Sequence, residues 1–80
     1  MKTIYIDKIE VIETGNIHVR FKKLSSDGDE IGFHRTVFEK DCDIHSQFEL
    51  VNGHIEEMGF AKLPDSDMDK ITEYSKLAWK

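Results

Sequence analysis

The chain has 80 residues, of which 39% are hydrophobic and 34% are charged, and its formal net charge is −5. This balance is typical of one soluble globular domain, expected over residues 1–80, and the acidity argues against a protein that binds nucleic acid directly through bulk positive charge. No apolar run approaches the roughly 20 residues that span a bilayer, the N-terminus lacks a signal-peptide pattern, and the single cysteine excludes an internal disulfide.

Three segments of the first half are predicted to be strands: about residues 3–13, 17–24 and 29–39. They are rich in β-branched and aromatic residues, and glycine-containing turns separate them. The register that best separates apolar from charged side chains pairs Val11 with Val19 and Ile9 with Phe21, then Phe21 with Ile31 and Val19 with Phe33. We therefore expect an antiparallel meander in strand order 1-2-3 with one apolar face.

The opposite face of this meander is expected to be solvated and mostly charged. One less charged patch on this face combines imidazole, guanidinium and aliphatic side chains and is a candidate contact surface. Its residues are Ile12, His18, Arg20 and His34. The two histidines resist joint protonation if they lie side by side, although two exposed histidines on a wet sheet face are the commoner explanation.

A helix is predicted over about residues 46–58, because Phe48, Val51, Ile55 and Met58 recur at helical spacing. Ser46 fits the N-cap, with Glu49 completing a capping box. The competing interpretation is a hairpin that turns on Asn52-Gly53. We favour the helix, because the apolar stripe and its caps outweigh one dipeptide.

A second helix is predicted over about residues 66–79, after Pro64, with Asp65 or Ser66 as its cap. Strands followed by helices indicate an α+β domain, here a three-stranded meander with both helices packed on one sheet face.

The sharpest chemical alternative is a metal site at Cys42, His45 and His54. Zinc needs three or four such ligands around one point, whereas Cys42 and His45 form only half of a motif. Acidic neighbours raise the pKa of a thiol, so Cys42 is a poor nucleophile. No phosphate-binding glycine loop or catalytic constellation is visible, so we expect neither an enzyme nor a cofactor.

Three short motifs follow one another along the chain: Gly15-Asn16-Ile17-His18-Val19-Arg20, Asp27-Gly28-Asp29-Glu30-Ile31 and His34-Arg35-Thr36-Val37. Together with Val51-Asn52-Gly53-His54-Ile55, they resemble a group of small proteins of tailed bacteriophages and prophages. The resemblance covers about residues 10–60, and Cys42 departs from the pattern of the group. It implies an accessory or structural role among virion and tail proteins and implies no activity.

The favoured hypothesis is a non-enzymatic phage-derived protein that acts through protein–protein contacts in the host cytoplasm or the virion. A small core and the lack of a disulfide favour completion by a copy of itself, preferably a dimer, or by a phage structural protein. The alternative is a small acidic phage protein that modulates a host nucleic-acid-binding protein.

The expected interface lies on the third strand and at the C-terminus. Strand 3 is an edge of the meander, and edges invite pairing with another chain. The apolar residues expected to be available there are Val37, Phe38, Leu77 and Trp79. A two-fold contact is expected, because it is the commonest arrangement of identical chains. In the competing interpretation, Phe38 and Trp79 fold back onto their own core.

Overall fold

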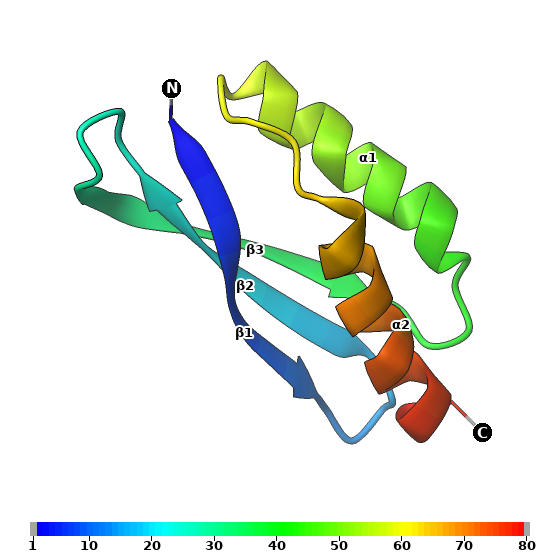
Figure 1. Ribbon diagram of the computed structural model, residues 1–80. Coiled ribbons are helices and arrows are strands. Elements are labelled where there is room, and N and C mark those ends of the chain that lie inside the picture. The colour runs from blue at the N-terminus through cyan, green and yellow to red at the C-terminus, as the bar shows by residue number, and fades with distance from the viewer. Residues whose placement is uncertain (1, 80) are drawn as a thin grey trace.

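The computed structural model describes residues 2–79 as an antiparallel sheet covered on one face by two helices (Figure 1). The strands are β1 (Thr3–Val11), β2 (Ile17–Leu24) and β3 (Glu30–Phe38), in the order β1-β2-β3. The helices are α1 (Ile44–Glu57) and α2 (Asp65–Ala78). The predicted α+β fold is therefore confirmed. The two sides of the sheet are called the inner face, toward the helices, and the outer face.

Both hairpins use a three-residue loop that ends in glycine. In the first, the backbone N–H of Ile12 bonds to the carbonyl of Asn16 at 3.0 Å, and Gly15 has a φ of 91°. In the second, Ser25 pairs with Asp29 and Gly28 has a φ of 89°. A left-handed residue follows the type I turn in such loops, so glycine belongs at their last position. The predicted pairing of Val11 with Val19 implies a loop of residues 14–16 with Gly15 in its middle, and this placement is wrong.

The pairing of β1 with β2 differs from the predicted register. Ile9 pairs with Val19, not with Phe21, and Phe21 pairs with Ile6. The register shifts between Ile6 and Lys8, so Asp7 is an additional residue that forms a β-bulge. This bulge changes the phase of alternation, and both halves of β1 thereby direct isoleucines to the inner face.

The pairing of β2 with β3 also differs from the predicted register. Val19 pairs with Thr36 and Phe21 with His34, where the prediction paired them with Phe33 and Ile31. A second bulge lies where Lys23 pairs with Gly32 and Leu24 with Glu30. The register is displaced by an odd number of residues. The side chains of β3 that were predicted to face the helices therefore lie on the outer face, and those predicted to face solvent lie on the inner face.

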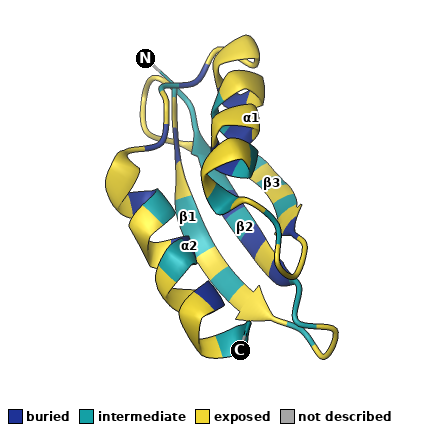
Figure 2. Ribbon diagram, turned by 90° about the vertical axis from the view of Figure 1, so that its right-hand side faces the viewer, coloured by how far each residue is buried: buried dark blue, intermediate teal, exposed yellow. Residues whose placement is uncertain are grey.

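The core lies between the inner face and the helices (Figure 2), and its largest fully buried side chains come from β2, β3, α1 and α2. Phe38 is 0% exposed, so its predicted exposure is wrong. Ile31 and Phe33, predicted to be buried, are exposed. The fully buried set is Phe21, Phe38, Ile17, Ile55, Ile71 and Val19.

Helix α1 begins three residues earlier than the predicted capping box implies. Its N-cap is Asp43, whose carboxylate accepts hydrogen bonds from the backbone N–H of Ser46 at 3.2 Å and from its hydroxyl at 3.1 Å. Asn52 lies within the helix, and its carboxamide oxygen accepts a hydrogen bond from the backbone N–H of Leu63 at 2.9 Å. Asn52 therefore holds the connector to α2 and does not form a hairpin turn.

Gly53 lies in the middle of α1, where a Cβ atom would meet no atom within 4 Å. We expect Gly53→Ala to raise the free energy of unfolding by about 1 kcal/mol, because glycine is the poorer helix former. Urea unfolding followed by circular dichroism measures this change. A loss of stability would contradict a continuous helix through this position.

Candidate functional site

The outer sheet face combines exposed apolar side chains with cations, and neither helix covers it (Figure 1). Its large apolar residues are 39–49% exposed and come from both edge strands: Tyr5 on β1, and Ile31, Phe33 and Val37 on β3. The bulge at Ile31 produces this arrangement, because it places Phe33 and Val37 outward and Phe38 inward. Three large apolar side chains of one edge strand therefore line the same open face.

An ion-pair network crosses the middle of the outer face. Asp7, the additional residue of the β1 bulge, accepts a hydrogen bond from Nε of Arg20 at 2.8 Å and lies 2.7 Å from its Nη2. Lys22 lies 2.9 Å from Glu30 and 3.8 Å from Asp7, and the hydrogen bond with Glu30 raises the pKa of Lys22. The guanidinium of Arg20 stacks on the ring of Phe33, 4.9 Å from its centroid. These contacts fix Arg20 and Phe33 against each other.

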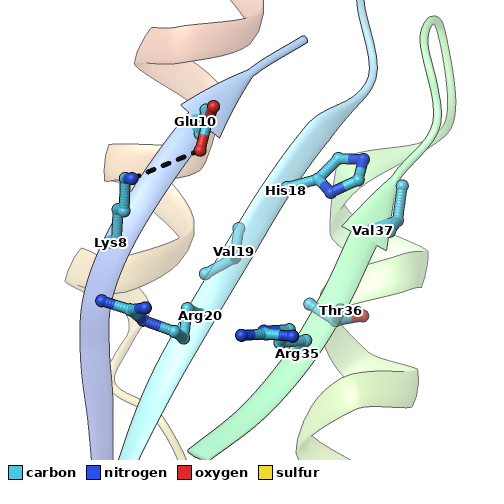
Figure 3. A pocket seen from close by; sticks show the side chains of 8 residues that line it. All are labelled: Lys8, Glu10, His18, Val19, Arg20, Arg35, Thr36 and Val37. Carbon is cyan, nitrogen blue, oxygen red and sulfur yellow. Dashed lines mark ion pairs between the residues drawn. The ribbon is translucent and has the colours of Figure 1, made fainter.

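A shallow hollow of about 460 Å³ lies on this face. Each strand supplies one cation to it: Lys8 from β1, Arg20 from β2 and Arg35 from β3 (Figure 3). Lys8 lies 3.4 Å from Glu10, whereas Arg35 has no ion pair among residues 2–79. The hollow is therefore bordered by a cation that no carboxylate of the described chain neutralises.

Only two of the four residues of the predicted exposed patch share the outer face. His18 and Arg20 lie on the outer face and line the hollow, and Ile12 is half-buried in the first loop. His34 lies on the inner face, where its ring stacks on Phe21 with centroids 6.1 Å apart. Its predicted place beside His18 is therefore wrong, because the β3 bulge reverses the phase of that strand.

The four residues of the predicted interface do not share one surface. Val37 lies on the outer sheet face and Leu77 is exposed on α2, in the other layer. Phe38 is buried in the core, and Trp79 packs against that core and donates a hydrogen bond from its indole N–H to the carbonyl of Gly15. The competing interpretation, in which Phe38 and Trp79 fold onto their own core, is the one that the structure supports.

The predicted metal ligands lie apart along α1 and before it. His45 is in the first turn of α1 and His54 in its last, and a step of nine positions places them about 13.5 Å apart along the helix axis. Within residues 2–79 no three side chains of the metal-ligating types form a cluster. Burial raises the pKa of the Cys42 thiol, and Asp43 and Glu39 raise it further.

Burial also lowers the pKa of His34, with Lys23 and His54 adding to the effect. The unfolded chain then binds a proton at this imidazole more readily than the folded protein does. The stability that neutral His34 contributes is therefore fully present above about pH 6.5, and it is lost as the pH falls below that value toward the lower pKa of the folded state.

We expect His34→Gln to lessen the loss of stability between pH 7 and pH 5. Urea unfolding at the two pH values, with an NMR titration of the imidazole, checks this. An equal loss in both proteins would contradict it.

Neither helix of residues 2–79 has the length and apolar character needed to cross a bilayer. A scan against protein-family models gives no match to the chain, and neither a search of curated proteins nor a search of solved structures gives one.

Proposed function

We propose that this chain is a non-enzymatic, phage-derived accessory or structural protein that acts through protein–protein contacts and associates with itself. One observation carries the proposal: an open sheet face on which four large apolar side chains are 39–49% exposed among arginines and lysines. Small soluble domains rarely leave such a group of side chains to solvent unless it contacts a partner. Aromatic and arginine side chains are also the residues that contribute most at protein interfaces.

The phage setting of the proposal comes from the sequence motifs around Arg20 and Val37. Both residues belong to the segments that resemble small proteins of tailed phages, and both lie on the outer face. A contact surface built from the motif residues fits an accessory of the virion or of its assembly in the host cytoplasm.

The alternative of an acidic protein that occupies a host nucleic-acid site has weaker support. Several acidic side chains of the helical layer lie close to lysines: Glu56 to Lys62 at 3.7 Å, Asp67 to Lys70 at 3.8 Å and Glu73 to Lys76 at 3.4 Å. A surface that imitates nucleic acid needs a continuous run of negative charge. Alternation with lysine favours the protein-contact proposal.

Sedimentation velocity from low micromolar to millimolar concentration tests self-association. We expect the wild type to associate as concentration rises, and the double variant Phe33→Asp, Val37→Asp to stay monomeric with an unchanged circular dichroism spectrum. Tyr74→Asp, which changes an exposed aromatic residue on α2, is the matched control and should associate like the wild type.

Two outcomes would contradict the proposal. One is a wild type that stays monomeric at every concentration. The other is association that survives the change on the outer face but is lost in Leu77→Asp, which would place the contact on α2.

A further inference from the structure

We infer that the surface that receives the outer sheet face of one copy is the exposed side of α1 on the next, so that copies join head to tail. The inference rests on the proposed self-association and adds the identity of the second surface. It follows from three features of α1: an exposed leucine on an open surface, a glycine that its own fold does not require, and carboxylates that complement the cations of the sheet.

The side of α1 away from the core is an open surface, to which no other element contributes a lining residue. Leu50 lines it and is 61% exposed, and Gly53 lines it one turn further along. The remaining lining residues are polar: Ser46, Glu49, His54 and Glu57. An apolar side chain with a polar rim is the usual anatomy of a contact surface.

Gly53 has no role within its own copy that requires the absence of a side chain. It has no positive φ, and a Cβ atom there would meet nothing within 4 Å. Glycine nevertheless weakens a helix interior relative to alanine. Its effect on the surface is a flat space next to Leu50, which an apolar side chain such as Phe33 from another copy can fill.

The charges of the two surfaces are opposite. Glu49 and Glu57 are both exposed, with side chains 70% and 81% accessible. Among residues 2–79 neither lies within 4 Å of a lysine or arginine; their charged neighbours are His45 and His54. On the sheet, Arg35 likewise lacks an ion pair with the described chain. Opposite charges at a contact select the partner surface and its orientation.

The two surfaces lie on opposite layers of the molecule, the sheet and the helices (Figure 2). One copy therefore uses both at once, each toward a different neighbour. Such a heterologous contact gives a ring if the rotation between copies closes and an open chain if it does not. A two-fold contact between two sheet faces would instead stop at a dimer.

Mixing two variants distinguishes these arrangements. Phe33→Asp, Val37→Asp removes the sheet surface and keeps α1 intact. Gly53→Arg places a long cationic side chain on the open surface of α1, where it blocks contact and opposes the sheet cations. Arginine is a good helix former, so this variant stays folded. We expect each variant alone to associate at least about tenfold more weakly than the wild type. Mixed in equal amounts, they should form one heterodimer and nothing larger, whereas the wild type grows beyond a dimer.

These experiments separate a failure of the head-to-tail arrangement from a failure of self-association itself. If Gly53→Arg associates like the wild type while the sheet variant is monomeric, the head-to-tail inference is overturned and the proposed function stands. If the wild type is monomeric, both fall. A monomeric wild type that binds single-stranded oligothymidylate, with binding lost in Phe33→Asp, Val37→Asp, would assign the sheet face to nucleic acid and overturn both as well.

Discussion

Replacing Phe38 by alanine is expected to lower the free energy of unfolding by about 3–5 kcal/mol, because the ring is wholly buried and its loss leaves a cavity. Small domains have only about 5–15 kcal/mol of stability, so this change removes much of it. Phe33→Ala is the matched control, since the same side chain on the same strand is 48% exposed. It should cost less than about 1 kcal/mol, mainly through lost contact with Arg20.

Urea unfolding of the two variants measures both changes. The comparison is a direct test of the β2–β3 register, because a displacement by one residue exchanges the two rings between the faces. A larger loss for Phe33→Ala than for Phe38→Ala would contradict the observed register and restore the sequence-based one.

The second large effect is expected at Trp79. Its ring packs against the core, and its indole N–H donates to the carbonyl of Gly15 in the first hairpin loop, 64 residues away in the chain. Trp79→Ala should lower the free energy of unfolding by about 3 kcal/mol, and Trp79→Phe, which keeps most of the apolar contact, by about 1 kcal/mol.

Thermal unfolding, followed by circular dichroism at constant protein concentration, checks the Trp79 series. The folded Trp79→Phe variant should associate as the wild type does, because the side chain belongs to the core. If either variant dissociates the protein without loss of stability, Trp79 belongs to an interface, as the sequence first indicated.

The elements were predictable because their signals are local. Periodicity identified the three strands and both helices to within a few residues, and Pro64 and the glycine turns marked their limits. The cap of α1 was misplaced because Asp43 and Ser46 both satisfy the preference for an N-cap, and only the helical geometry decides between them.

The faces of the sheet were less predictable because each bulge reverses the alternation of a strand. Isoleucines at positions 4 and 6 and again at position 9 of β1 share a face only if one residue between them is additional. Gly32 inside β3 is the corresponding signal, since an internal glycine often accompanies a bulge. A sheet without the second bulge would expose Phe38 and bury Phe33, and the outer face would lack the apolar side chains Phe33 and Val37.

The most direct test of the central claim, that the outer sheet face is a contact surface, is a dilution series followed by backbone NMR. As concentration rises from micromolar to millimolar, the amide signals of Ile31, Phe33 and Val37 should shift together, while that of Leu77 stays in place. Signals of the outer face that do not change at any concentration, while others do, would show that the protein uses a different surface.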